Sequence, residues 1–130
     1  MPREAVRWFR RAADQGNAAA QTSLGHMYEL GKGVPRDSAE AICWYRKAAD
    51  QGDAAAMLLL GERYESGDGV PQSFVDAHVW YNIAGSISTG QDNHENRQSA
   101  MEGRNRAASR MTSAQIAEAQ RRAREWKVKP

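Results

Sequence analysis

Residues 41–52 read AICWYRKAADQG, and nearly the same series of residue types stands at residues 5–16, which read AVRWFRRAADQG. A third tryptophan follows at the same interval, so Trp8, Trp44 and Trp80 are spaced 36 residues apart. A fixed interval of this size is typical of solenoids, in which each short unit buries its apolar face only against its neighbours. The sequence therefore predicts a stack of repeated units.

The repetition extends beyond these two segments. When residues 1–35 are laid over residues 37–71, 20 positions are identical. A third, partial copy begins at Asp76 and runs to Ala84. Because a solenoid usually works by presenting a surface, this pattern predicts the architecture and says little about the partner.

Each unit is expected to contain two helices, of which the first spans residues 18–30 and again residues 54–66. Leu24 and Tyr28 lie one turn apart and share a face of that helix. Gly25 lies in its middle, where glycine costs about 1 kcal/mol relative to alanine. We infer that a neighbouring helix approaches there too closely for a methyl group.

The second helix is expected at residues 37–50 and again at residues 73–86. Its apolar stripe has the i, i+3, i+4, i+7 spacing of a core-facing helix and comprises Ala41, Trp44, Tyr45 and Ala48 in the first complete copy. Asp37 and Ser73 each stand three residues before an acidic residue. This spacing predicts a capping box at the start of each second helix.

A glycine-rich loop joins the two helices of each unit and reads GKGVP at residues 31–35 and GDGVP at residues 67–71. A phosphate-binding loop would need a preceding strand and a following Gly-Lys-Ser/Thr, and both are missing. We therefore expect a helix stop, a turn with positive φ, a buried valine and a proline that opens the next helix.

The pattern as a whole resembles the Sel-one-like repeat, a relative of the tetratricopeptide repeat. The resemblance rests on residues 20–28, 31–37 and 41–52, whose motifs recur one repeat later. It implies an all-α fold: a right-handed α/α superhelical solenoid of 36-residue helix-turn-helix repeats, about seven helices in all. In such a fold the first helices line the concave side.

We expect a single repeat domain that covers residues 1–130. Its parts are a half repeat (1–16), a repeat (17–52), a second repeat (53–88) and divergent C-terminal capping helices (89–130). Within the last part, residues 91–110 predict a longer polar helix, and Thr112 begins a capping box that leads into a helix at residues 116–126. This ending is similar to the terminal capping helix of bacterial family members.

The composition, with 26% charged and 41% hydrophobic residues, is that of a soluble chain without a membrane span. The N-terminus carries no apolar leader, which favours the cytoplasm, or the periplasm if the chain is a processed fragment. Cys43 is the single cysteine, so no intrachain disulfide can form. We expect it to pack as a small hydrophobic residue beside Trp44.

The C-terminal part is basic, with eight arginines and lysines from Arg104 to Lys129 against Glu118 and Glu125. Such a stretch could attract nucleic acid. A solvated helix face is the preferred interpretation, because Trp126 is the only aromatic residue among these charges.

No catalytic, cofactor or metal site is predicted. His26, His78 and His94 share no metal-ligand spacing and are expected on the solvated surface, with His94 in an irregular segment. Glu62 and Glu65 could act as an acid–base pair, but we expect both to be exposed and fully solvated.

A partner-binding surface has more support in the sequence than a catalytic site. By analogy with tetratricopeptide relatives, the solvent-facing positions of the concave face comprise Thr22, His26, Glu29, Leu58, Glu62 and Glu65, with Ala19 and Ala55 beside them. Three carboxylates and one leucine would suit a peptide with basic residues and an apolar anchor. The alternative is that this face is merely solvated.

The N-terminal half repeat lacks the first helix that would normally cover it, so Trp8 and Phe9 are expected at an uncapped edge. Self-association into a homo-oligomer through this edge is one interpretation, and a trimmed fragment is the other.

The first functional hypothesis is therefore a non-enzymatic scaffold for a peptide or protein partner, which the family resemblance supports. The second is β-lactam binding or hydrolysis, as associated with cysteine-rich relatives that pair cysteines within each repeat, a feature that this chain does not have. The third is nucleic-acid binding through residues 104–129, which salt should weaken steeply.

Overall fold

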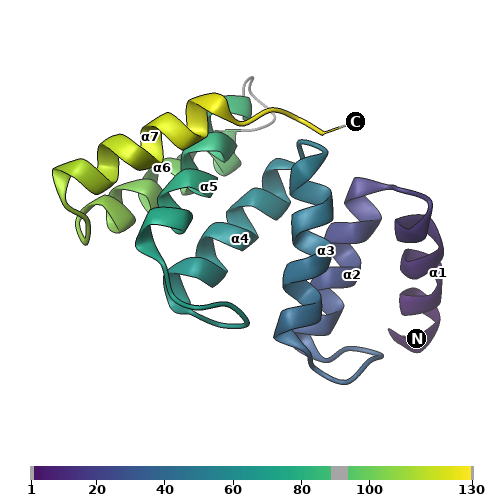
Figure 1. Cartoon of the computed structure of the whole chain (residues 1–130). Helices are drawn as coiled ribbons and strands as arrows, with labels where there is room; N and C mark the ends of the chain where they lie inside the picture. Colours follow the sequence, from purple (N-terminus) through teal and green to yellow (C-terminus); the bar gives the residue numbers. More distant parts are fainter. Residues whose placement is uncertain (1, 89–93, 130) are drawn as a thin grey trace.

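The computed structural model describes residues 2–88 and 94–129 of the chain, and the regular structure in these residues is entirely helical (Figure 1). The helices are α1 (Pro2–Asp14), α2 (Ala18–Leu30), α3 (Ser38–Asp50), α4 (Ala54–Ser66), α5 (Phe74–Ile87), α6 (His94–Ala108) and α7 (Ser113–Glu125). They follow one another from α1 at one end of the molecule to α6 and α7 at the other (Figure 1). The structure is thus an all-α repeat solenoid, as the resemblance implied, with α2, α4 and α6 as first helices.

The ends of the first helices are set by local residues. Asn17 and Asp53 accept hydrogen bonds from the backbone N–H groups of Ala20 and Ala56 at 2.9 and 3.1 Å. These caps satisfy amides that a helix start leaves without a partner. At the other end of α2, Gly31 adopts a left-handed conformation with φ of 71°, which closes the helix and starts the glycine-rich loop.

The predicted capping boxes at the second helices form only in part. Asp37 accepts from the Glu40 N–H at 3.1 Å, but its own N–H donates to the Tyr28 carbonyl at 2.9 Å. Ser73 behaves in the same way, with its N–H on the Tyr64 carbonyl. The donor that a capping box needs is therefore already used to hold the loop, and a simple cap results. The box predicted at Thr112 does form.

Close packing between the helices of one repeat explains the glycines in the middle of the first helices. A Cβ atom added at Gly25 would lie 2.7 Å from Cε1 of Tyr45 on α3, and one at Gly61 would lie 2.6 Å from Cε1 of Tyr81 on α5. These distances are too short for real atoms, so the predicted close approach of a neighbouring helix is confirmed.

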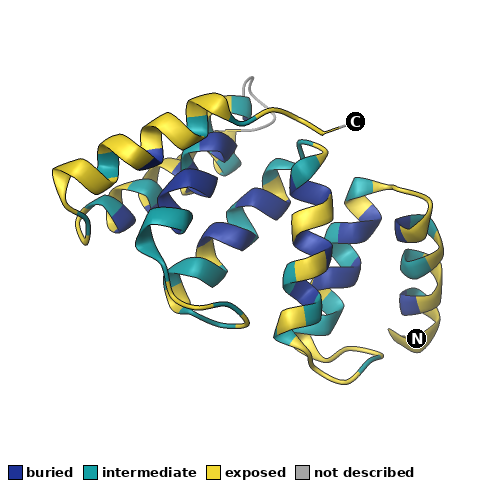
Figure 2. Ribbon diagram, in the orientation of Figure 1, coloured by how far each residue is buried: buried dark blue, intermediate teal, exposed yellow. Residues whose placement is uncertain are grey.

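The core runs along the array between successive helices, and the exposed residues lie on the outward faces of the helices (Figure 2). Leu24 and Leu60 are fully buried, each worth roughly 1.5–3 kcal/mol by transfer from water. Trp44, Tyr45, Trp80 and Tyr81 are buried as the stripe predicts. Val34 is only half-buried, because it packs at the margin of the cluster around Leu24.

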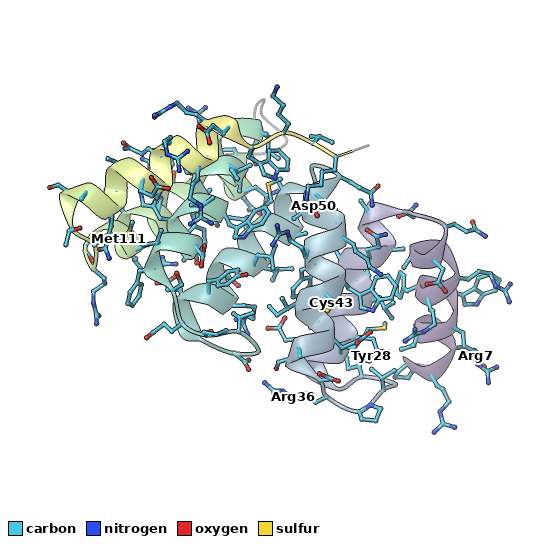
Figure 3. All side chains as sticks on the ribbon, viewed as in Figure 1. Arg7, Tyr28, Arg36, Cys43, Asp50 and Met111 are labelled. Atoms are coloured by element: carbon cyan, nitrogen blue, oxygen red, sulfur yellow. The ribbon has the colours of Figure 1, made fainter. Side chains whose placement is uncertain are left out.

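The chain after α7 folds back across the array. Trp126 packs edge-on against Trp80, with ring centroids 6.5 Å apart. The Lys129 N–H then donates to the carbonyl of Asp50 at 2.7 Å, at the C-terminal end of α3 (Figure 3). The last residues therefore connect α7 to α3, which lies four helices, or two repeats, earlier in the chain.

Two helix boundaries near the C-terminus differ from expectation. The part of the expected helix 91–110 that the structure describes begins at His94, so this histidine opens α6 instead of lying in an irregular segment. Residues 91–93 of that prediction lie outside the described residues. α7 begins at Ser113, earlier than expected, because Thr112 serves as its cap. None of the described helices has the length and apolar character needed to cross a membrane.

Candidate interaction surface

Two of the predicted binding carboxylates lie inside networks that join successive helices. The Tyr45 hydroxyl of α3 donates to Glu29 of α2, and Arg63 of α4 approaches the same carboxylate at 2.6 Å. One repeat later, Tyr81 donates to Glu65 at 2.7 Å. Each glutamate therefore bonds to a tyrosine of its own repeat and an arginine of the next first helix.

The second network closes through a residue that the 36-residue register does not predict. The position one repeat after Arg63 is Ser99, yet Glu65 is bound by Arg106, seven residues further along α6. The Arg106 guanidinium meets both carboxylate oxygens, at 3.0 and 3.2 Å. A two-pronged contact of this kind is among the stronger charged hydrogen bonds.

The hydrogen bonds and ion pairs of these networks hold the two carboxylates and shift the pKa values of groups in the networks. Burial opposes the ionisation of Glu65, but the hydrogen bonds from Arg106 and Tyr81 outweigh it and lower the pKa of that carboxyl. Burial and the adjacent glutamate raise the pKa of Tyr45 and of Tyr81. The Glu29 side chain is 13% exposed and that of Glu65 23% exposed. Both glutamates therefore have structural partners before any ligand arrives.

Glu62 differs from these two glutamates. It makes no ion pair with any residue in the described parts of the chain, and the residue is exposed. Partial burial of its carboxyl raises its pKa, and the Arg63 charge only partly offsets this. The expectation that both glutamates are exposed therefore holds for Glu62 and is wrong for Glu65, whose carboxylate is paired with Arg106 and only 23% exposed.

Thr22, His26 and Leu58 have three different environments. The Thr22 hydroxyl lies 3.1 Å from the Ala18 carbonyl and 3.3 Å from Asp53, so it also supports the start of α4. His26 is exposed, with Nδ1 3.5 Å from the Tyr45 hydroxyl. Leu58 is half-buried against the core. The six predicted residues thus do not form one uniform row.

Thr22 and His26 lie beside Phe9, which the sequence placed at the N-terminal edge, and beside residues that the sequence did not predict at any site. A cavity of about 430 Å³ opens at the N-terminal edge, lined mainly by apolar atoms. Its walls comprise Phe9, Thr22, Ser23, His26, Met27, Leu30 and Lys32. We refer to it below as the N-terminal cavity.

A sequence signal for this cavity exists in the repeat register. Phe9 stands where later repeats have Tyr45 and Tyr81, and Met27 stands where the next repeat has Arg63. The tyrosine–arginine pair that flanks each glutamate is therefore replaced by two apolar side chains at this end. Comparing the copies position by position would have found the substitution.

Trp8 is exposed on the N-terminal helix α1, as expected. The Trp8 side chain is 69% exposed, with the Arg11 guanidinium 5.6 Å above its ring. Arg7 also lies on the outer side of α1, pointing away from the array (Figure 3). Self-association through this edge stays a prediction.

Two expectations about single reactive side chains are wrong. His78 is buried, because it lies on α5 where α6 covers that helix. Cys43 is exposed, because its position on α3 falls outside the apolar stripe (Figure 3). In residues 2–88 and 94–129 no three histidine, cysteine or acidic side chains are grouped so that they could hold a metal ion.

Half of the eight basic residues in the C-terminal stretch already have acidic partners. Besides Arg106, they are Arg121 with Glu118 and Glu125, Arg122 with Asp76, and Lys129 with Asp50. These pairs reduce the charge available to a polyanion, so the structure adds nothing in favour of nucleic-acid binding.

These features define a class: an all-α helical-repeat protein whose first helices are joined by tyrosine–glutamate–arginine networks. The family model for the Sel1 repeat matches residues 2–17, 18–53 and 54–86. The chain belongs to the Sel1 repeat family.

Two crystal structures are similar to this chain. One is c5321, a protective antigen present in uropathogenic Escherichia coli strains that displays an SLR fold, with 36% identity and a TM-score of 0.86. The match covers 95% of this chain and 25% of that one, so the chain spans about a quarter of its length. The other is a Sel1 repeat protein from Oxalobacter formigenes, with 38% identity, a TM-score of 0.62, and 72% and 69% of the two chains covered. No curated protein matches the chain.

Proposed function

We propose that this chain is a non-catalytic module that binds a peptide or protein partner on the face formed by its first helices, α2 and α4. The family supports the general role, since Sel1 repeat proteins generally act as protein-interaction scaffolds. The observation that carries the proposal is the N-terminal cavity, because a concave apolar site with a few polar groups at its rim is the usual form of a binding site.

The cavity accounts for the apolar part of the partner. Phe9, Met27 and Leu30 provide apolar walls, and Leu30 is one of the few large hydrophobic residues that are exposed. A leucine or aromatic side chain of the partner would be desolvated there, which is where interface energy concentrates. Thr22 and His26 at the rim offer hydrogen bonds that would fix its orientation.

Glu62 accounts for a basic part of the partner. It occupies the same repeat position as His26, one repeat further along the array. Its carboxylate is exposed and has no cationic partner among the described residues, and the pKa of this carboxyl is raised. A lysine or arginine of the partner would supply that cation, whereas Glu29 and Glu65 already have theirs. Leu58, packed on the core, would serve as the floor between the two positions.

A peptide-display selection on the immobilised protein tests this proposal. We expect enriched peptides to carry one large apolar residue and at least one basic residue. Their affinity should fall at least about tenfold, or ~1.4 kcal/mol, in the double variant Thr22→Arg, Met27→Arg. Arginine at position 27 is the residue that the next repeat has at this place, so circular dichroism should show an intact fold.

The control is Ala39→Arg, Cys43→Arg, which adds the same two side chains at exposed positions on α3. Selected peptides should bind this variant like the unmodified protein. Peptides that lose binding equally in both variants, or a selection that enriches nothing, would contradict a site on the first-helix face.

A further inference from the structure

A second cavity, of about 260 Å³, lies between α5 and α6 and differs in character from the N-terminal cavity. Asn82 and Ser86 contribute to it from α5, and Arg97, Met101 and Arg104 from α6. Drug-sized ligands usually occupy roughly 300–1,000 Å³. This cavity therefore suits a small group or a single side chain.

The positive charges of this cavity have no ionic partner in the described parts of the chain. Arg97 and Arg104 lie seven residues apart, which is close to two helical turns, so both project from the same side of α6. Neither forms an ion pair with a carboxylate in residues 2–88 or 94–129. Arg106, two residues on, points to the opposite side of the helix and is neutralised by Glu65. The two flanks of α6 thus differ, with one paired arginine and two unpaired ones.

The acidic residues of α6 do not neutralise Arg97 and Arg104. Glu102 accepts a hydrogen bond from Gln98 at 3.0 Å and lies two residues before Arg104, so it points away from the cavity side. Glu95 stands in the same relation to Arg97. The carboxylates of the helix are therefore kept off the face that carries the two arginines.

The hydrogen-bonding groups of the cavity are mainly donors. The Asn82 amide donates to no residue that the structure describes. Ser86 uses its proton on the Ile83 carbonyl at 2.8 Å, so its hydroxyl adds no donor. Two guanidinium groups and one amide are therefore available as hydrogen-bond donors to a ligand in the cavity.

His78 lies on the same side of α5, one turn before Asn82, and is close enough to Arg104 to be affected by its charge. It is 2% exposed and its Nδ1 has no partner among the described residues. Burial, and after it the positive charge of Arg104, lower the pKa of this imidazole. Among residues 2–88 and 94–129, no carboxylate opposes this effect.

We propose that the cavity between α5 and α6 binds a carboxylate group, which Arg97 and Arg104 would grip while the Asn82 amide donates to it. Arginine forks match the planar geometry of a carboxylate. Met101 and Ala100 line the remaining wall and would contact the methylene groups that precede the carboxylate. The carboxylate comes from an acidic side chain of a peptide or from a small dicarboxylic acid.

This site is independent of the proposed peptide-binding face. None of its residues belongs to the N-terminal cavity, and Glu62 does not line it. A failure of one proposal therefore leaves the other intact, since each has its own variants and its own readout.

The test is a titration of the isotope-labelled protein followed by nuclear magnetic resonance, including the arginine side-chain signals. The probes are glutarate, N-acetyl-glutamate N-methylamide as a mimic of an acidic residue in a chain, the corresponding glutamine compound and inorganic phosphate. We expect saturable shifts at Asn82, Arg97 and Arg104 with a carboxylate probe and none with the glutamine compound. The tighter of the two carboxylate probes identifies the source.

The variant Arg97→Gln, Arg104→Gln should weaken that binding at least tenfold. The control is Arg124→Gln, Lys127→Gln, which removes the same charge at exposed positions of the C-terminal stretch and should leave binding unchanged. Equal weakening in both variants, shifts spread over all basic residues, stronger binding of phosphate than of either carboxylate, or no shifts at all would each overturn the proposal.

Discussion

At the scale of single residues, the ring of Tyr81 shows how tightly the repeats are packed. A Cβ atom added at Gly61 on α4 or at Gly103 on α6 would lie 2.6 Å from Cε1 of this ring. The ring therefore lies between two helices that can approach it only because both positions are glycine. Its hydroxyl is fixed as well, by the hydrogen bond to Glu65. A side chain held on both faces and at its tip cannot move aside for a methyl group.

We expect Gly103→Ala to lower the free energy of unfolding by about 1–3 kcal/mol, although alanine is the better helix former by about 1 kcal/mol. Chemical denaturation followed by circular dichroism measures the change. Gly85→Ala is the matched control, because its added Cβ would meet the Ala100 methyl at an ordinary 3.5 Å. That variant should be neutral or more stable. Equal effects of both substitutions would show that the Tyr81 contact is unimportant.

At the scale of helices, the tyrosine–glutamate–arginine networks join each first helix to the next. Glu29 links α2 to α4, and Glu65 links α4 to α6. The second link forms even though α6 departs from the repeat pattern, because Arg106 reaches the carboxylate from a different position along the helix. The glutamate–arginine pairing is therefore retained where the sequence register is not.

Replacing Glu65 by glutamine tests this link through its pH dependence. The folded-state pKa of Glu65 is lowered, so the pair stabilises the protein above the unfolded-state pKa, and this stability is lost as pH falls through the folded-state pKa. Because the arginine is more than half exposed, we expect a loss of only about 1 kcal/mol at pH 7. The difference between the two proteins should shrink on acidification below pH of about 4.5.

Thermal unfolding at a series of pH values measures this difference. Glu118→Gln is the control, since Glu118 pairs with Arg121 on the fully exposed side of α7 and its loss should have a smaller effect. A loss at Glu65 that stays constant from neutral to acidic pH would mean that shape, and not charge, matters at this position.

At the scale of the whole molecule, each helix contacts mainly its neighbours along the array. The stability of such a solenoid is close to a sum over repeats and the interfaces between them. Its parts should therefore be removable in units of one repeat. The Escherichia coli antigen, of which the match covers 25%, displays an SLR fold in a longer chain.

Deleting residues 37–72 removes one complete repeat and joins Arg36 to Ser73 within equivalent loops. We expect a folded, helical protein with cooperative but less stable unfolding, because α2 would take the place of α4 and Glu29 would meet Tyr81 and Arg106. Deleting residues 36–52 removes α3 alone, places two first helices in succession and should abolish cooperative unfolding. Circular dichroism with thermal melting distinguishes the two. Similar behaviour of both deletions would contradict a fold built of 36-residue units.

The amino-acid sequence by itself determined the repeat length, the first helices and the close contacts at Gly25 and Gly61, because these depend on patterns local to one unit. The tertiary structure decided what each surface group does. Glu29 and Glu65 proved to be paired, His78 buried, and Arg97 and Arg104 without an ionic partner in the described parts of the chain, because each outcome depends on which side chain of another helix lies opposite. Helical periodicity gives the face on which a residue lies, but its partner is fixed only when the helices are stacked.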